Sequence, residues 1–295
     1  MHLIKEIIQE CDKRYSKSSC SKNLIYCKTT CDGNSCETCL SLIHFQHGPG
    51  RKYDCTRMAD FYVAQFACKY TSEILYAIQT LQLPSTFNAN VLSIGCGPCT
   101  DLFAFEYWLQ KKKISSLQYH GFEINPIWGN IHNDIISAAN AKKLRVDIIT
   151  NPDIDVFYYI KDTYQIPNII VLQYVLSDIY KQTPAAINSF ITQLADYFNN
   201  TMPTGSVIIL NDVNSCNCGR DHFDKFFLLL NNCTATKRHF ANNYNDSIGK
   251  HTYYYGNQYP HNHIDYKAFL DDYALDNKYS SKRYCSSAQC LIKKG

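Results

Sequence analysis

The stretch that decides the fold is NVLSIGCGPCTD, residues 90–101. Its first five residues are largely apolar and branched, which is typical of a buried strand. The glycines at 95 and 97 then predict a tight turn, and residues 100–113, TDLFAFEYWLQKKK, have the spacing of a helix with a basic last turn. A strand, a glycine turn and a helix in this order predict the first unit of a parallel α/β sheet.

The same alternation repeats along the chain. Further strands are predicted at residues 117–124, 145–150, 168–176, 205–213, 251–256 and 287–294, and further helices at 1–19, 58–83, 126–143, 186–202 and 222–232. Several of these strands are almost wholly apolar, as expected for a parallel sheet that helices cover on both faces. The fold class is therefore predicted as α/β, with a doubly wound, Rossmann-like sheet.

Composition limits the possible function classes. The chain has 295 residues, 45% of them hydrophobic, which fits one large domain or a domain with a small appendage. A net charge of +3 does not indicate the strongly basic field of a dedicated nucleic-acid-binding protein. No run approaches the roughly 18 apolar residues of a membrane span, and the first residues form an amphipathic stripe rather than a secretory signal. We therefore expect a cytoplasmic protein.

The glycine turn and one acid indicate a nucleotide-like ligand. In a doubly wound sheet the ligand lies beyond the carboxyl ends of the strands, and the first turn must let backbone approach it closely. Gly95 and Gly97 meet this need, and Glu123 ends the second strand, where a carboxylate accepts hydrogen bonds from ribose hydroxyls. A nicotinamide site normally has a third glycine here, and the chain contains no GxxxxGK[ST], so dehydrogenase and NTPase activities are not indicated.

Two motifs carry a resemblance to a known family. VLSIGCGPCTD resembles the first motif of the class I S-adenosylmethionine-dependent methyltransferases, and YHGFEINP resembles their acidic second motif. The resemblance covers residues 58–295, because NIIVLQYVLSDI and GSVIILND are similar to the fourth- and fifth-strand motifs. It implies a seven-stranded methyltransferase sheet with an antiparallel last strand, and S-adenosylmethionine as the cofactor.

The resemblance also implies a set of cofactor-binding residues. Gly95 and Gly97 would face the methionine portion, Glu123 the ribose, Asp153 the adenine and Gln173 the sulfonium side. The sequence departs from the family pattern at two points. Ser93 stands where many members carry an acid, and Pro98 and Cys99 fill the turn in place of the third glycine.

The catalytic candidates follow the fourth and fifth strands. Methyl transfer from a sulfonium depends mainly on positioning and a dry pocket, so few catalytic residues are obligatory. The fourth strand lacks the [DN]PP[FY] motif and a Pro-Cys pair, which disfavours methylation of base amines and of cytosine carbon. Asp178, Asp212 and His222 are predicted to face the substrate, and the alternative for each is a loop residue or helix cap.

The cysteines indicate a separate N-terminal module. Seven of the 15 cysteines lie in residues 11–55, so we expect an N-terminal helix and Cys-rich module at 1–57 and a methyltransferase domain at 58–295. Cys27, Cys31, Cys36 and Cys39 have spacing suited to one Zn²⁺, which would supply folding free energy to this segment. Cys20, His44, His47 or Cys55 could join or replace these ligands. An iron–sulfur cluster, or free thiols, are the alternatives.

The acceptor is the least determined feature. RNA is favoured over a small metabolite or a protein side chain because a predicted zinc module adjoins the fold, and because basic runs lie at 111–116, 237–240 and 280–284. Aromatic residues at 251–263 could also stack on an unpaired base. A methyltransferase for small molecules or proteins, and a binding protein that has kept the fold without catalysis, remain the alternatives.

Overall fold

The computed structural model describes residues 2–18, 35–45, 53–153, 156–162, 166–214, 219–240, 261–262, 273–279, 281–282, 285 and 287–295. Its strands are β1 (Asn88–Ile94), β2 (Ser116–Glu123), β3 (Arg145–Thr150), β4 (Ile169–Gln173), β5 (Val207–Val213), β6 (Cys233–Phe240), β7 (His261–Asn262) and β8 (Ser287–Lys294). Its helices are α1 (Leu3–Lys17), α2 (Cys36–Phe45), α3 (Thr56–Leu81), α4 (Thr100–Gln110), η1 (Pro126–Trp128), α5 (Gly129–Ala141), α6 (Val156–Asp162), α7 (Val175–Gln182), α8 (Ala186–Thr201), α9 (Asp221–Phe227) and α10 (Asp276–Tyr279). None of the described helices is long and apolar enough to cross a membrane.

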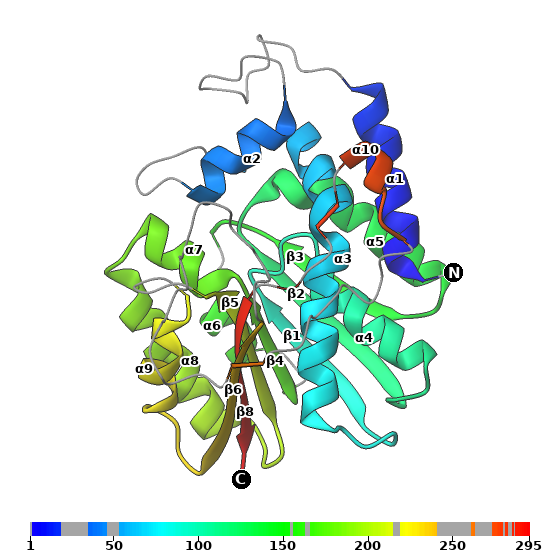
Figure 1. Cartoon of the computed structure of the whole chain (residues 1–295). Coiled ribbons are helices and arrows are strands. Elements are labelled where there is room, and N and C mark those ends of the chain that lie inside the picture. The colour runs from blue at the N-terminus through cyan, green and yellow to red at the C-terminus, as the bar shows by residue number, and fades with distance from the viewer. Residues whose placement is uncertain are drawn as a thin grey trace.

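One sheet runs through the molecule in the order β3-β2-β1-β4-β5-β8-β6-β7 (Figure 1). Strands β1 to β5 are parallel, and β8 runs antiparallel between β5 and β6. The chain reverses its direction of travel across the sheet between β1 and β4, which is where such sheets bind ligands. The predicted Rossmann-like sheet with an antiparallel last strand is confirmed, and the two-residue β7 extends the seven expected strands.

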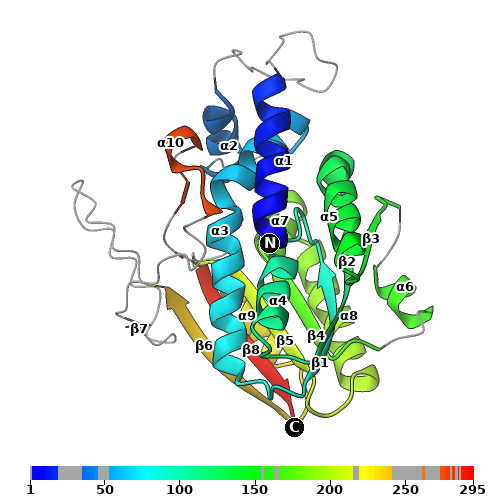
Figure 2. The same cartoon turned by 90° about the vertical axis from the view of Figure 1, so that its right-hand side faces the viewer.

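Alternate residues of the central strands belong to two separate cores. Val207 and Ile209 of β5 pack on the side of α1, α3, α4 and α5, whereas Ile208 and Leu210 pack on the side of α6 to α9. All four side chains are at most 1% exposed. Figure 2 shows α1, α4 and α5 on the face turned toward the viewer. This burial on both faces explains why the strand sequences are continuously apolar rather than alternating.

The structure corrects two boundaries and adds a strand. The strand predicted at 168–176 is wrong after Gln173, because Tyr174 has a φ of 62° and α7 begins at the next residue. Leu176 is 1% exposed inside that helix, so its apolar character could not distinguish helix from strand. The helix predicted at 222–232 ends at Phe227, and β6 forms where no strand was predicted because β8 supplies its pairing partner. The strand predicted at 251–256 lies outside the described residues.

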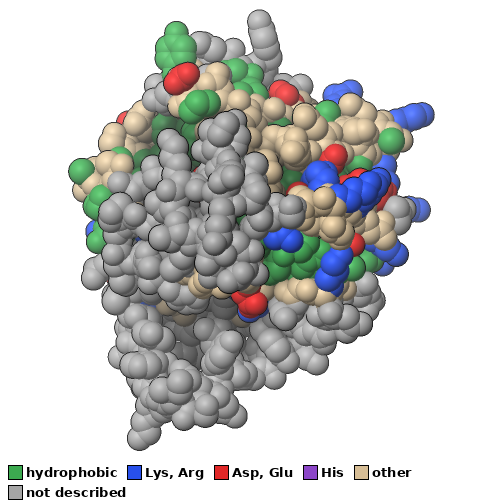
Figure 3. All heavy atoms as spheres, turned by 90° about the horizontal axis from the view of Figure 1, so that it is seen from above, with side chains coloured by type: hydrophobic (Ala, Val, Ile, Leu, Met, Phe, Trp, Pro, Cys, Tyr) green, Lys and Arg blue, Asp and Glu red, His purple; other side chains and the backbone are tan. Residues whose placement is uncertain are grey.

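The N-terminal helices share the core of the sheet. Leu3, Ile7 and Cys11 of α1 are at most 1% exposed and belong to the same apolar cluster as α3 and α4. Arg14 of α1 donates to Asp60 of α3 at 2.7 Å and forms an ion pair with Asp134 of α5. Figure 3 views the molecule from the carboxyl ends of the strands. In this view, Lys and Arg side chains gather on the right, which is the side of α1 in Figure 1. The domain boundary at 57/58 stays a prediction.

Replacing Ile7 by Ala tests whether α1 unfolds with the sheet. We expect the free energy of unfolding to fall by about 2–5 kcal/mol in a single urea transition, because the change removes buried methyl groups from the shared core. Lys13→Ala, on the exposed side of the same helix, is the control and should change the free energy of unfolding by less than about 0.5 kcal/mol. A main transition that Ile7→Ala leaves unchanged would show that α1 unfolds independently.

Candidate active site

The glycine turn at the carboxyl end of β1 adopts left-handed backbone at three positions. Gly95, Gly97 and Cys99 have φ values of 64°, 49° and 55°. A Cβ on Gly95 would lie 2.9 Å from the Val175 side chain, so close packing requires glycine there. A Cβ on Gly97 would meet nothing within 4 Å. The turn is therefore pressed against α7 at Gly95 and has open space beside Gly97, where a ligand could approach the backbone.

Glu123 is held against this turn. Its Oε2 accepts a hydrogen bond from Gly97 N–H at 2.7 Å, and its Oε1 accepts one from Asn125 N–H at 2.8 Å. Burial raises the pKa of Glu123, and the two backbone N–H groups only partly offset this. Each carboxylate oxygen keeps a further lone pair, so the side chain can still accept hydrogen bonds from a bound hydroxyl pair.

Gln173 ends β4 and links three elements. Its side-chain oxygen accepts a hydrogen bond from the Thr100 hydroxyl at 2.8 Å, and its Nε2 donates to the Tyr70 carbonyl at 2.8 Å. The amide therefore ties β4 to the start of α4 and to α3. This places Gln173 beside the glycine turn, where its observed contacts are those of a positioning residue.

Asp153 follows β3 at the same edge of the sheet. Thr150, the last residue of β3, pairs with Glu123, and Asp153 lies three residues further along in an exposed turn. Its backbone N–H donates to the Asn151 side chain at 2.9 Å. The predicted adenine-facing role stays a prediction.

Asp178 lies in the first turn of α7, near Glu123 and two tyrosines. The Asp178 side chain is exposed, yet desolvation by surrounding protein raises the pKa of Asp178 to about 6, with Lys181 lowering it and Glu123 raising it. Its charge in turn contributes to raised pKa values of Tyr53 and Tyr62, for which burial is the larger cause. Asp178 therefore lies within electrostatic range of Glu123 and of both phenols.

Asp212 is a buried group inside β5. Its carboxylate accepts hydrogen bonds from Ser177 N–H at 3.1 Å and Val213 N–H at 2.7 Å. A Cβ on Gly219 would lie only 2.2 Å from Asp212 Oδ1, so the chain after β5 packs directly on this carboxyl group. Burial raises the pKa of Asp212 to about 6. Its contacts hold the start of α7, which carries Asp178.

His222 lies on α9 and is 2% exposed. Its ring centroid is 5.4 Å from that of Tyr180, and neither ring nitrogen has a hydrogen-bond partner in the part of the chain that is described. Burial and the nearby Lys225 lower its pKa. The imidazole is therefore neutral at pH 7 and keeps a lone pair that could accept a proton.

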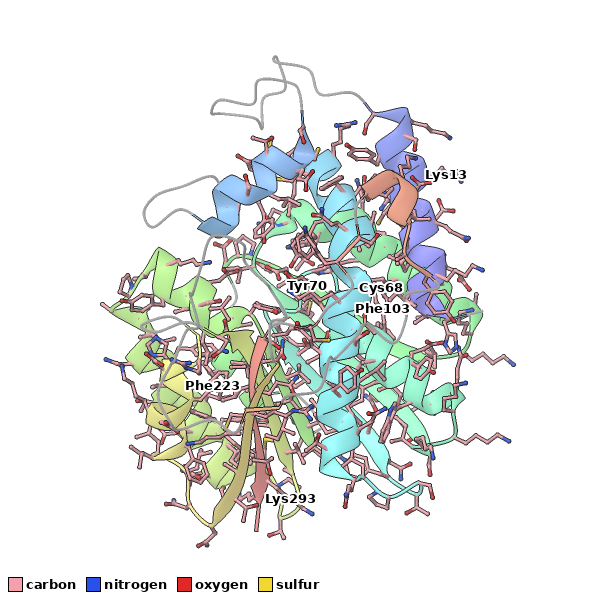
Figure 4. All side chains as sticks on the ribbon, in the orientation of Figure 1. Lys13, Cys68, Tyr70, Phe103, Phe223 and Lys293 are labelled. Atoms are coloured by element: carbon pink, nitrogen blue, oxygen red, sulfur yellow. The ribbon has the colours of Figure 1, made fainter. Side chains whose placement is uncertain are left out.

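An aromatic cluster covers the carboxyl ends of the strands. Its members are Tyr53, Tyr62, Tyr70, Trp128 and Tyr174, with neighbouring ring centroids 4.7 to 5.8 Å apart. Figure 4 shows Tyr70 beside α3, level with the upper ends of the central strands. The Asn125 side chain donates to the Tyr53 carbonyl at 2.9 Å, and this contact joins the cluster to the residue that also bonds Glu123. The cluster gives the site an apolar wall.

Three functional candidates were not predicted from the sequence. His132 of α5 contacts the Gly97 carbonyl through Nε2 at 2.6 Å and the Thr150 hydroxyl through Nδ1 at 2.8 Å. Cys96, Cys99 and His132 bring their side-chain donor atoms within 4.8 Å of one another. The Cys-x-x-Cys spacing of residues 96–99 was a signal in the sequence, whereas nothing local indicates that His132 folds onto this turn.

The structure describes two of the four predicted metal ligands. Cys36 and Cys39 are buried and lie one helical turn apart on α2, and Arg57 donates to Cys36 Sγ at 3.4 Å. Cys27 and Cys31 lie outside the described residues, as do Cys20, His47 and the side chain of His44. Cys55, the remaining alternative, is partly buried and precedes α3.

Comparison with models of protein families and with curated proteins finds no match to this sequence. Solved structures do resemble the chain. The human methyltransferase 10 domain containing protein has a TM-score of 0.44 at 8% identity, covering 77% of this chain and 82% of that one. A putative O-methyltransferase from Klebsiella pneumoniae has a TM-score of 0.42 at 10% identity, covering 76% and 80%. The O-methyltransferase from Bacillus cereus has a TM-score of 0.40 at 16% identity, also covering 76% and 80%.

The raised pKa of Glu123 predicts a pH dependence of ligand binding. A carboxylate accepts hydrogen bonds from a hydroxyl pair at both oxygens only when deprotonated, so affinity for a ribose-containing ligand should fall as the pH drops through this raised pKa. The fall should begin at a less acidic pH than for an ordinary glutamate. Calorimetry across a pH series measures this affinity. Glu123→Gln is the control, because its side chain cannot titrate. Parallel pH curves for the two proteins would contradict the prediction.

Proposed function

We propose that this chain binds S-adenosylmethionine at the glycine turn and transfers its methyl group to a nucleophilic acceptor. The observation that carries the proposal is the Glu123 carboxylate, fixed against Gly97 N–H at the point where the strand order reverses. At such a point a buried acid with free lone pairs suits a ribose, and open space beside a glycine suits the remainder of the ligand. S-adenosylmethionine carries no diphosphate, so the absence of a third glycine in the turn is compatible with it.

The chain's own residues would bind, orient and shield the reactants. The sulfonium of S-adenosylmethionine supplies a methyl group on an excellent leaving group, so alignment in a dry pocket provides most of the acceleration. The aromatic cluster excludes water from one side. Asp178, with a pKa of about 6, is mainly deprotonated at pH 7 and would accept a proton from the acceptor nucleophile. His222 is the second candidate base, and Asp212 positions α7.

The positions of the basic residues weaken the argument for RNA as the acceptor. Lys111–Lys113 follow the end of α4, next to the starts of β1 and β2 and on the opposite edge of the sheet from the glycine turn. Lys237 forms an ion pair with Asp224, and Arg238 is 8% exposed and bonded to Gln289 and Thr80. These cations are not presented to a substrate at the proposed site. RNA remains a hypothesis, and a small metabolite or protein side chain stands beside it.

Calorimetry with S-adenosylmethionine tests the cofactor proposal. We expect the wild-type protein to bind, and Glu123→Ala to weaken binding by about 1–3 kcal/mol through lost hydrogen bonds to the ribose. Glu10→Ala, a change on the exposed surface of α1, is the matched control and should bind like the wild type. No binding at millimolar cofactor would refute the methyltransferase proposal and favour a binding protein that has kept the fold.

Labelled cofactor then identifies the acceptor. The protein is incubated with S-adenosylmethionine and separate RNA, protein and metabolite extracts. Asp178→Asn should keep cofactor binding but slow transfer by about 10²–10⁴-fold, because it removes the proton acceptor. Label in the metabolite or protein fraction alone would exclude RNA, and unchanged transfer by Asp178→Asn would exclude this base.

We also propose one zinc ion at the N-terminal cysteines. The support is the spacing of Cys27, Cys31, Cys36 and Cys39, together with the placement of Cys36 and Cys39 one helical turn apart. Elemental analysis of protein purified without added metal should give one zinc per chain, and less in Cys39→Ser. A metal-free protein with the same thermal stability in chelator would defeat this proposal.

A further inference from the structure

The cofactor turn contains a Cys-x-x-Cys pair whose geometry suits a disulfide. Cys99 N–H donates to the Cys96 carbonyl at 2.8 Å, which closes a turn over residues 96–99. Such a turn brings the two Cα atoms within about 7 Å, close to the range of about 4.4–6.8 Å that disulfides span. The two Sγ atoms already lie within 4.8 Å of each other.

The orientation of His132 favours thiol chemistry over a metal at this cluster. A carbonyl oxygen only accepts hydrogen bonds, so the 2.6 Å contact with Gly97 requires a proton on His132 Nε2. The other nitrogen, Nδ1, is 2.8 Å from the Thr150 hydroxyl. Neither nitrogen therefore has a lone pair free to ligate an ion that two cysteines would hold. The imidazole can instead stabilise a neighbouring thiolate.

The two cysteines differ in reactivity. Burial opposes ionisation of Cys99, but the neighbouring Cys96 thiol and His132 ring lower the pKa of Cys99 to about 5. Burial and the Cys99 charge raise the pKa of Cys96. Cys99 also precedes the first residue of α4, where the helix dipole favours a negative charge. One stable thiolate beside one thiol is the arrangement that resolves a mixed disulfide.

We propose that Cys96 and Cys99 are an oxidisable dithiol that controls cofactor binding, a role that rests on the function proposed above. The oxidant is a small disulfide such as oxidised glutathione. Cys96, which is 7% exposed, attacks the oxidant and forms a mixed disulfide, and its proton passes to the glutathione thiolate that leaves. The Cys99 thiolate then attacks Cys96 Sγ and releases the second glutathione as a thiolate. The cysteines lose two electrons, and the oxidant gains them.

Oxidation acts on the cofactor site through Gly97, which lies between the two cysteines. Gly97 N–H bonds Glu123 and its carbonyl contacts His132. Bond formation draws the sulfurs to about 2.05 Å. Cys96 Sγ is packed so closely over β2 that a Cβ on Gly121 would lie 2.9 Å from it, so the backbone of the turn must shift. That shift displaces Gly97 from Glu123 and weakens binding.

Differential alkylation of the full-length protein tests disulfide formation. The protein is equilibrated with mixtures of reduced and oxidised glutathione, free thiols are alkylated, and trypsin digestion is followed by mass spectrometry. Trypsin releases residues 70–111 as one peptide, which contains Cys96 and Cys99 and no other cysteine. We expect this peptide to lose two hydrogens and escape alkylation in oxidising mixtures, and to regain both thiols with dithiothreitol. Cys233→Ser is the control and should oxidise at this peptide like the wild type.

Calorimetry on the same samples tests the functional consequence. We expect oxidised wild-type protein to bind S-adenosylmethionine on the order of tenfold more weakly than reduced protein, with dithiothreitol restoring affinity. Cys96→Ser should bind equally under both conditions. The proposal is overturned if the peptide stays fully alkylatable, if oxidation leaves affinity unchanged, or if the wild-type protein holds zinc that Cys96→Ser loses. If the protein forms the disulfide on oxidation but does not bind S-adenosylmethionine even when reduced, the proposed function is refuted instead.

Discussion

The hydrogen bond from Gly97 N–H to Glu123 is the contact on which the candidate site depends. It joins the ends of β1 and β2, which are adjacent parallel strands, and fixes an acid that is only 9% exposed. A buried carboxylate is costly unless hydrogen bonds compensate for its lost hydration. The backbone N–H groups of Gly97 and Asn125 provide that compensation, so the loop on each side must keep its conformation for the acid to remain charged.

The part of this arrangement that is local in sequence could be predicted. The strand before Gly95, the left-handed turn and the acid at the end of β2 each follow from a short segment. Other features arise from pairing or packing between distant segments. β6 forms because β8 pairs with it, β4 ends where Tyr174 turns the chain, and His132 reaches Gly97 from a helix 35 residues away. The spacing of apolar residues along the sequence carries no information about such contacts between distant segments.

A buried polar network fixes the aromatic cluster in place. Glu73 of α3 is fully buried and accepts hydrogen bonds from the Tyr174 hydroxyl at 2.9 Å and from Asn211 at 3.0 Å. Gln289 of β8 donates both to the Glu73 carbonyl and to the Asn211 side chain, each at 2.7 Å. Breaking this network would leave buried hydrogen-bonding groups unsatisfied, so it ties α3 and the aromatic cluster on it to the sheet.

On the function proposed above, the carboxyl groups at this edge of the sheet would favour a cationic cofactor. Glu123 and Asp178 repel each other, and Asp178 also raises the pKa of Asp212. A sulfonium bound among these groups would relieve the repulsion and favour their charged forms. The proposed methyl transfer would neutralise the sulfur, so the product would lose this attraction while keeping its ribose contacts. The electrostatics that favour cofactor binding would then also favour product release.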